Sequence, residues 1–238
     1  MSKMIKLPQK GEVLVVGLGN HSVTADAMGP KTVEKLMVTR HLIEHIPEYI
    51  DERMRPVSSV APGVLGTTGI ETGEIVRGVV EKIKPCLVIA IDALAARRID
   101  RINTTIQITN TGINPGSGVG NKRQGLNKDT LGVPVIAIGV PTVVDASTMA
   151  RDTIDLVLQH MLSKSNGNVQ IGKLIEEIES TDKKDIIGEA LEPYLGDLAV
   201  TTKQIDSVTE KMSKILANGV NMALHEGISL NDIENFLC

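Results

Sequence analysis

Residues 88–97 read VIAIDALAAR, and this stretch decides the fold. An apolar run from Leu87 to Ile91 ends abruptly at an acid, Asp92, and small residues follow it. A short apolar run of this kind is typical of a strand buried on both faces of a parallel sheet. In an open parallel sheet, ligands bind beyond the carboxyl ends of the strands, where Asp92 stands. The acid is therefore either a functional group or a cap for a helix that follows it.

Other segments predict the rest of the same sheet. Short apolar runs bounded by turn residues predict strands within 12–19, 55–63, 86–93, 104–109 and 133–141. Apolar residues at helical spacing predict helices within 26–46, 69–85 and 144–162. Because strands that alternate with helices indicate βαβ units, we expect an α/β fold with three αβα layers and a mainly parallel sheet.

The last part of the chain has only helical patterns. A polar stretch at 163–170 precedes IGKLIEEIES (171–180), DIIGEALEPYLG (185–196) and a long helical pattern that ends near residue 225. We expect Thr201 or Thr202 to cap this last helix. The sequence therefore predicts an α/β domain over 1–162 and a helical C-terminal appendage over 163–238, packed on the same domain.

Composition and charge exclude several classes of protein. The net charge is −4 and aromatic residues make up 1% of the chain, so it offers neither a basic surface nor stacking platforms for nucleic acid. No stretch reaches about 18 apolar residues, so we expect no membrane span, and the N-terminus lacks a signal-peptide pattern. Cys86 and Cys238 have neither metal-site nor disulfide-framework spacing, which indicates a reducing, intracellular compartment.

The sequence VVGLGN (15–20) joins the first strand to the first helix. A dinucleotide-binding loop would need a third glycine at position 22, which is Ser22, and an acid some 20 residues further on. The alternative is a tight turn in which Gly17 and Gly19 avoid side-chain clashes. We favour the turn and expect no cofactor.

Two acids, Asp26 and Asp92, follow the first two strong strands. Each could merely cap a helix. If the two strands are neighbours, however, the carboxylates meet at the carboxyl edge of the sheet, and close carboxylates tend to share a proton. One can then deprotonate a water while the other donates a proton. A helix N-terminus favours the anionic form of Asp26, whereas the apolar approach to Asp92 disfavours charge there.

The stretch NTGINPGSGVGNKR (110–123) is too rich in glycine for a simple connector of its length. It either exposes backbone N–H groups to a ligand or peptide, or forms only a mobile loop. A second stretch rich in Gly and Thr, 55–72, is expected to form another substrate wall. The residues that we expect to bind substrate are Asn20, Gly116, Ser117, Gly118 and Gly120.

The histidines do not match a familiar metal or triad motif. His41 and His45 are four residues apart, but HLIEH lacks the H-E-x-x-H order of zinc peptidases, so we expect a solvated or structural role. His21 lies near Asp26 in sequence and could contact the same site. No G-x-S-x-G motif is present, which argues against a serine triad. We therefore expect no metal site.

Several long stretches resemble one known family. They are VVGLGNHSVTADAMGP (15–30), RPVSSVAPGVLGTTGIET (55–72), VIAIDALAARRIDRINTTIQITNTGINPGSGVGNKR (88–123) and LGVPVIAIGVPTVVDA (131–146). They resemble the germination proteases of spore-forming Firmicutes, nearly continuously from about residue 12 to 160. The resemblance continues more weakly in LAVTTKQID (198–206) and ANGVNMALH (217–225).

This resemblance implies an endopeptidase that degrades small acid-soluble spore proteins during germination, in the cytoplasm of the forespore or the spore core. It places the two catalytic aspartates on Asp26 and Asp92, which would activate water and protonate the amide nitrogen. It also implies a zymogen, a homotetramer, and a fold like that of the hydrogenase-maturation peptidases, which use their acids and a histidine to recognise nickel.

The chain departs from the family pattern in three places. Only 14 residues precede Val15, where the family has a long N-terminal region with a propeptide, so we expect a fragment or a short form. Asn114 stands where the family commonly has a histidine, which speaks against a metal-centred mechanism. The segment before the last helices is shorter. Two alternatives remain: a non-catalytic paralogue that binds spore proteins, and a metal-dependent maturation-type peptidase.

Overall fold

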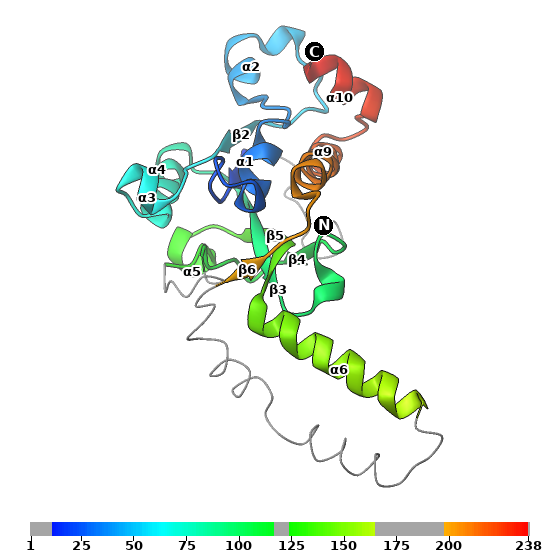
Figure 1. Cartoon of the computed structure of the whole chain (residues 1–238). Coiled ribbons are helices and arrows are strands. Elements are labelled where there is room, and N and C mark those ends of the chain that lie inside the picture. Colours follow the sequence, from blue (N-terminus) through cyan, green and yellow to red (C-terminus); the bar gives the residue numbers. More distant parts are fainter. Residues whose placement is uncertain (1–10, 117–123, 165–197, 238) are drawn as a thin grey trace. The chain divides into compact units, whose positions relative to one another are not determined.

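The computed structural model describes residues 11–116, 124–164 and 198–237 (Figure 1). The chain divides into two compact units. The first comprises Met1–Leu94, Thr105–Val140 and Lys203–Cys238, and the second comprises Ala95–Thr104 and Pro141–Thr202. This division differs from the predicted boundary at residue 162, because α9 (Ile205–Leu224) belongs to the first unit and α6 (Ala146–Lys164) to the second.

The sheet, most of which belongs to the first unit, has the strand order β2-β1-β3-β5-β4. The strands are β1 (Val13–Gly17), β2 (Val57–Val60), β3 (Leu87–Ala96), β4 (Gln107–Thr109) and β5 (Val135–Asp145). Strand β1 pairs in parallel with both β2 and β3, whereas β4 pairs with β5 in antiparallel fashion. The predicted neighbourhood of the first two strong strands is therefore confirmed.

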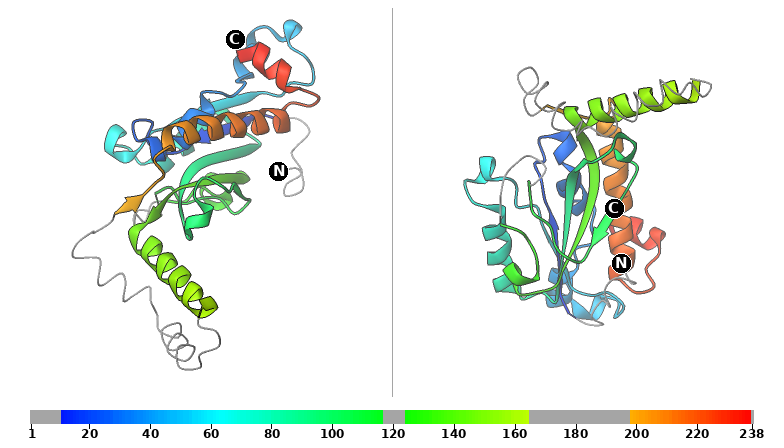
Figure 2. Two further views of the ribbon diagram at one scale, coloured as in Figure 1. Left: turned by 45° about the vertical axis from the view of Figure 1, so that its right-hand side comes forward. Right: turned by 90° about the horizontal axis from the view of Figure 1, so that it is seen from below.

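Helices cover both faces of this sheet (Figure 2). On one face, α1 (Met28–Val33) and α9 pack against Val15 and Ile89. On the other face, α4 (Thr72–Ile83) and α5 (Lys128–Leu131) pack against Val16 and Val88. Successive residues of a strand point to opposite faces, so one continuous apolar strand supplies both clusters. The predicted three-layer αβα fold is confirmed.

The prediction of one helical segment over 26–46 is wrong, because the chain forms three short helical elements there. They are the 3₁₀ turn η1 (Thr24–Asp26), α1, and α2 (Arg40–His45). Thr39 lies at the last break, where its hydroxyl donates to Arg55 O over 2.5 Å and accepts the N–H of Val57 over 3.0 Å. A threonine hydroxyl that binds a neighbouring backbone offers the chain an alternative to continuing the helix.

The start of α9 also differs from the prediction. Its N-cap residue is Gln204, not Thr201 or Thr202. The hydroxyl of Thr201 instead donates to Thr142 O over 2.6 Å, beside β6 (Ala199–Val200), which pairs with the end of β5. The hydroxyl is thus used at the edge of a strand rather than at a helix end.

Helix α9 is fixed to the segment after α1 by one buried amide. The N–H of Met37 donates to Asn221 Oδ1 over 3.0 Å, and Asn221 Nδ2 donates to Lys35 O over 3.4 Å. Because the side chain is 1% exposed, these bonds satisfy polar groups that water does not reach. The helix that the sequence assigned to an appendage is therefore part of the layer over the sheet.

The remaining described elements are short. They are η2 (Pro47–Tyr49), α3 (Leu65–Thr68), η3 (Ile99–Arg101) and α10 (Leu230–Leu237). The helices predicted over 171–180 and 185–196 lie outside the described residues. In the part of the chain that the structure describes, no helix has the length and apolar character needed to cross a membrane.

The first helix, α1, begins in direct contact with the end of β1 and with the middle of β3. A Cβ atom on Gly29 would lie 2.3 Å from Leu18 O and 2.5 Å from Ile91 O. A Cβ atom on Gly17 would lie 2.4 Å from Gly29 O. Since all of these neighbours are backbone atoms, they cannot swing away as a flexible side chain can. The interpretation of VVGLGN as a tight turn that requires glycine is confirmed.

Replacing Gly29 with alanine should therefore destabilise the fold strongly. We expect Gly29→Ala to lower the free energy of unfolding by about 3 kcal/mol, because an added methyl group must push apart two strands and a helix. Urea unfolding measures the change. The matched control is Gly78→Ala in α4, where a Cβ atom meets nothing within 4 Å; it should stabilise by about 0.5–1 kcal/mol. Equal stability of the two variants would contradict the close approach.

Candidate active site

Asp26 is held by the turn that joins β1 to α1. Its Oδ2 accepts the N–H of Asn20 over 2.7 Å, and its own N–H donates to Val23 O over 2.8 Å. A Cβ atom on Gly19, where φ is +113°, would lie 2.0 Å from Asp26 O. The turn therefore closes on Asp26 through backbone contacts. The N-cap of α1 is Ala27, without a side-chain bond, so the alternative that Asp26 caps this helix is wrong.

Asp92 lies within β3, which continues to Ala96. No helix begins after it, so the capping interpretation of Asp92 is wrong as well. Leu94 explains why the small residues stay extended: its Cδ1 would lie 2.2 Å from a Cβ atom on Gly139, so its side chain fills the space over that glycine. Packing against β5 therefore overrides the helical propensity of an alanine-rich segment.

The carboxyl group of Asp92 is almost inaccessible to solvent. The residue is 6% exposed, and its Oδ1 accepts the N–H of Ala93 over 2.9 Å. Burial raises the pKa of Asp92 to about 7, the negative charge of Asp26 adds to the rise, and the Ala93 N–H opposes it. The charge effect of Asp26 places the two groups within electrostatic range of each other. Direct contact between the two carboxyl groups stays a prediction.

The two carboxyl groups have different surroundings. Asp92, buried against apolar neighbours, retains a proton up to about neutral pH. Asp26 is half-buried, and its Oδ2 accepts the backbone N–H of Asn20. The roles of the two groups in acid–base chemistry stay a prediction.

Asn20, predicted to bind substrate, is adjacent to this pair. Its backbone N–H binds Asp26, and its Oδ1 accepts the N–H of Ser22 over 3.0 Å. The side chain thus closes the local turn. A role in substrate binding stays a prediction, and the structure adds that Asn20 orients Asp26.

The base of the glycine-rich stretch packs on the face of the sheet to which Asp92 belongs. Ile113 and Leu126 exchange backbone hydrogen bonds of 3.0 and 2.7 Å, and Leu126 is buried in the same cluster as Val88 and Ala90. Since alternate residues share a face, Asp92 follows these two residues on that face. The loop thus rises from the side of the sheet that carries the acid.

Little of the predicted substrate loop itself is described. Gly116 is described and has a left-handed φ of +69°. Ser117, Gly118 and Gly120 lie outside the described residues. Asn114 is described, and its Oδ1 would lie 2.3 Å from a Cβ atom on Gly125, so the two sides of the loop touch there.

Three histidines that the sequence analysis considered, His21, His41 and His45, are described. His21 Nε2 is 3.0 Å from Glu34 Oε1 on the exposed surface, and His41 and His45 are exposed, as expected. Within residues 11–116, 124–164 and 198–237, no three His, Cys, Asp or Glu side chains are grouped so that they could hold a metal ion.

One residue near the site was missed in the sequence. Thr209 of α9 is fully buried, and its hydroxyl donates to Thr24 O, at the start of the turn that carries Asp26, over 3.4 Å. No local signal could have found it, because the contact joins residues 185 positions apart. Helix α9 therefore supports the turn from behind.

These features define an α/β protein in which a buried aspartate, Asp92, lies within electrostatic range of a second one, Asp26, held by the turn after β1. Comparison with known proteins gives the family. The germination protease family model matches residues 1–170 and 162–237. The chain belongs to the germination protease family, and it is a peptidase.

Its relatives are similar over the whole chain. The germination protease of Clostridium acetobutylicum is 55% identical over 240 residues, which cover 100% of this chain and 73% of the relative. That of Bacillus subtilis is 49% identical over 255 residues, which cover 94% of this chain and 69% of the relative. The chain thus spans about seven-tenths of the length of these relatives.

A solved structure is also similar. The nickel–iron hydrogenase maturation protease HycI from Thermococcus kodakarensis aligns with a TM-score of 0.37 and 18% identity, over 59% of this chain and 79% of that chain. The three-layer fold of the present chain is established by its own strand order and its two helical layers.

Asp92 should make the stability depend on pH in a defined direction. Its pKa in the folded chain lies above the ordinary value of 3.8. The folded protein therefore keeps a proton that the unfolded chain releases between roughly pH 4 and 7, and the free energy of unfolding falls as the pH rises through this range. The Asp92→Asn side chain is neutral at every pH. We therefore expect the free energy of unfolding of the variant, relative to that of the wild type, to be about 2 kcal/mol higher at pH 8 than at pH 5.

Urea unfolding of both proteins at the two pH values measures this difference. The control is Asp206→Asn, which changes an exposed carboxylate on α9 and should alter the stability equally at both pH values. A wild type and an Asp92→Asn variant whose stabilities differ by the same amount at both pH values would show that Asp92 titrates as an ordinary acid.

Proposed function

We propose that this peptidase is an endopeptidase that degrades small acid-soluble spore proteins during spore germination, using Asp26 and Asp92 to activate water. The observation that carries the proposal is the raised pKa of the buried Asp92 carboxyl beside the charge of Asp26. Membership of the germination protease family supports the substrate and its location in the forespore or the spore core.

The proposed reaction follows from the two settings. Asp26 takes a proton from a water molecule as the water oxygen attacks the carbonyl carbon of the scissile peptide. Asp92 then gives its proton to the amide nitrogen, and the carbon–nitrogen bond breaks to leave a new carboxyl group and a new amine. Asp26 now holds the proton that Asp92 has lost. Return of that proton between two adjacent carboxyl groups restores the starting state.

The substrate is proposed to lie along the glycine-rich loop. Gly116 is the last described residue before this loop, and Ser117, Gly118 and Gly120 continue it in sequence. Asn20, next to Asp26, is proposed to bind the same substrate. Backbone N–H groups that glycine leaves unshielded suit an extended peptide, whose own carbonyl groups need donors. An unfolded or small flexible protein can present such a segment, which agrees with a small spore protein as substrate.

Zymogen control and assembly into a homotetramer are proposed on the family resemblance. Neither is needed for the chemistry above, because both acids come from one chain. Gel filtration of the purified protein, with light scattering, measures the assembly directly.

The test of the proposed function is cleavage of a purified small acid-soluble spore protein by the wild type and by Asp26→Asn and Asp92→Asn. Each replacement should lower the cleavage rate by roughly 100-fold or more, because it removes the proton acceptor or the proton donor. Asp206→Asn should cleave like the wild type. A strong chelator should leave the wild-type rate unchanged.

Two results would contradict the proposal. A wild type that folds and binds the spore protein without cleaving it would favour the non-catalytic paralogue. Cleavage that the chelator abolishes, or that survives in both aspartate variants, would remove the carboxyl pair from the mechanism.

A further inference from the structure

The residue opposite Asp92 on the neighbouring strand is a glycine. Strands β3 and β5 are neighbours in the sheet, and the N–H of Val88 donates to Pro134 O over 3.0 Å near the start of both. Further along both strands, Leu94 lies over Gly139, so the two strands run in the same direction. In a parallel pair, this bond sets the residue before Val88 opposite Pro134, and each later residue one position further along. Asp92 is therefore opposite Gly139.

Leu94 fills the place that this glycine leaves open. Residues at opposite positions, and residues two apart on one strand, point to the same face of a sheet. Asp92, Leu94 and the missing side chain of Gly139 therefore share a face. Cγ and Cδ2 of Leu94 would lie 2.7 and 3.3 Å from a Cβ atom on Gly139, and Cδ1 would lie closer still. The Leu94 side chain thus leans back along the strand, into the position beside the Asp92 side chain.

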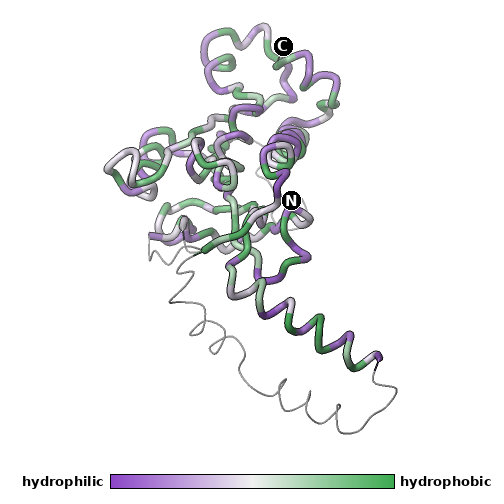
Figure 3. Tube along the Cα trace, viewed as in Figure 1, coloured by the Kyte–Doolittle hydropathy of each residue, from purple (hydrophilic) through white to green (hydrophobic). Residues whose placement is uncertain are grey.

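Solvent reaches this face of β3 from the end where Leu94 lies. Figure 3 shows β3 as an apolar strand over most of its length. On the face of Asp92, the exposed fraction increases along the strand: Val88 and Ala90 are 0% exposed, Asp92 is 6% exposed, and Leu94 is half-buried. Leu94 is therefore the side chain of this strand that lies between Asp92 and water.

We propose that Leu94 shields the Asp92 carboxyl group from solvent and is thereby a positioning residue for the proposed proton donor. The consequence for catalysis rests on the proposed function, whereas the shielding does not. An apolar side chain that excludes water from a carboxyl group disfavours its charged form.

The other groups that act on Asp92 can be separated from Leu94. The negative charge of Asp26, in the turn after β1, favours the protonated form of Asp92, and the N–H of Ala93 opposes it. Strand β5 contributes no charge at the opposite position, because Gly139 has no side chain. Since Leu94 belongs to neither of these interactions, a change of Leu94 tests the shielding alone.

Shortening Leu94 tests the proposal directly. Leu94→Ala removes the three atoms that fill the place over Gly139 and lets water approach Asp92. The pKa of Asp92 should therefore fall below its wild-type value of about 7. Titration of the Asp92 carboxyl by carbon NMR measures the change and requires no activity. Leu94→Met keeps an apolar side chain of similar volume, and it should keep the wild-type pKa.

An apolar side chain from the other strand should replace Leu94. The three atoms nearest to a Cβ atom on Gly139 all belong to Leu94, so Leu94→Ala leaves room for a side chain there. Gly139 lies within β5 and has no left-handed φ, so its backbone accepts a larger residue. The double variant Leu94→Ala with Gly139→Val should therefore return the pKa of Asp92 toward the wild-type value.

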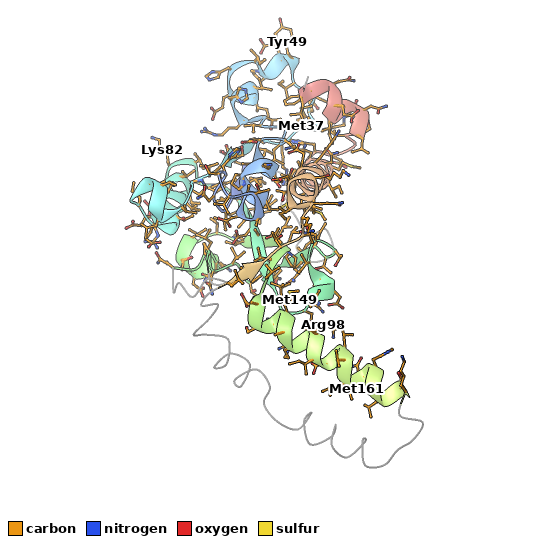
Figure 4. The ribbon with its side chains drawn as sticks, viewed as in Figure 1. Met37, Tyr49, Lys82, Arg98, Met149 and Met161 are labelled. Carbon is orange, nitrogen blue, oxygen red and sulfur yellow. The ribbon has the colours of Figure 1, made fainter. Side chains whose placement is uncertain are left out.

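Met37→Ala is the control for a general loosening of the fold. Met37 is fully buried in a separate cluster that includes α10, and it is labelled in Figure 4. Its N–H binds Asn221 of α9, whereas Thr209 of α9 binds the turn that carries the second acid. These two α9 residues are about 18 Å apart along the helix axis. Met37→Ala should lower the stability but leave the pKa of Asp92 unchanged.

The pH profile of cleavage extends the test to the reaction. If Asp92 gives its proton to the substrate, the rate falls as the pH rises through its pKa. A pKa lower by about one would reduce the protonated fraction at pH 7 from about one half to about one tenth. Leu94→Ala should therefore cleave a small acid-soluble spore protein roughly fivefold more slowly at pH 7, with a smaller difference at pH 5.

Three results of the titrations would overturn the proposal. They are an unchanged pKa of Asp92 in Leu94→Ala, an equal fall in Met37→Ala, and a fall in Leu94→Ala that Gly139→Val does not reverse. A wild type that cleaves no spore protein would contradict the proposed function and leave the titrations as a valid test of the shielding.

Discussion

The contact of Gly29 with the end of β1 and with the middle of β3 is the constraint on which the site depends. Backbone atoms of α1 and of the two strands lie so close there that no side chain fits. Since Asp26 is three residues before Gly29, this contact brings the turn that carries Asp26 against β3 beside Ile91, the residue before Asp92. Strand β3 carries Asp92 and the turn after β1 carries Asp26, and the packing of Gly29 holds this turn against β3.

The asymmetry between the two acids comes from the layers around them. Asp92 belongs to a strand covered on both faces, so burial is the largest cause of its raised pKa. Asp26 belongs to a turn at the surface of the sheet edge, held by Asn20 and supported by Thr209. One fold thus places two identical side chains in different surroundings, one buried in a strand and one held in a turn.

The sequence predicted what depends on local pattern. The strands, the parallel pairing of β1 with β3 and the glycine turn all follow from apolar periodicity and from where strands end. It failed where distant contacts decide. Leu94 keeps the residues after Asp92 extended by packing on Gly139, and Asn221 brings α9 onto the layer with α1. Neither contact can be predicted from the local sequence pattern, because each depends on a residue far along the chain.

The most direct measurement is the titration of the Asp92 carboxyl by carbon NMR, in the wild type and in Asp26→Asn. The account predicts a pKa of about 7 in the wild type. It predicts a lower pKa in Asp26→Asn that still exceeds 3.8, because burial is the larger cause and the charge of Asp26 the smaller. A wild-type pKa near 3.8 would contradict the buried proton donor. A raised pKa that does not change in Asp26→Asn would contradict the pairing of the two acids.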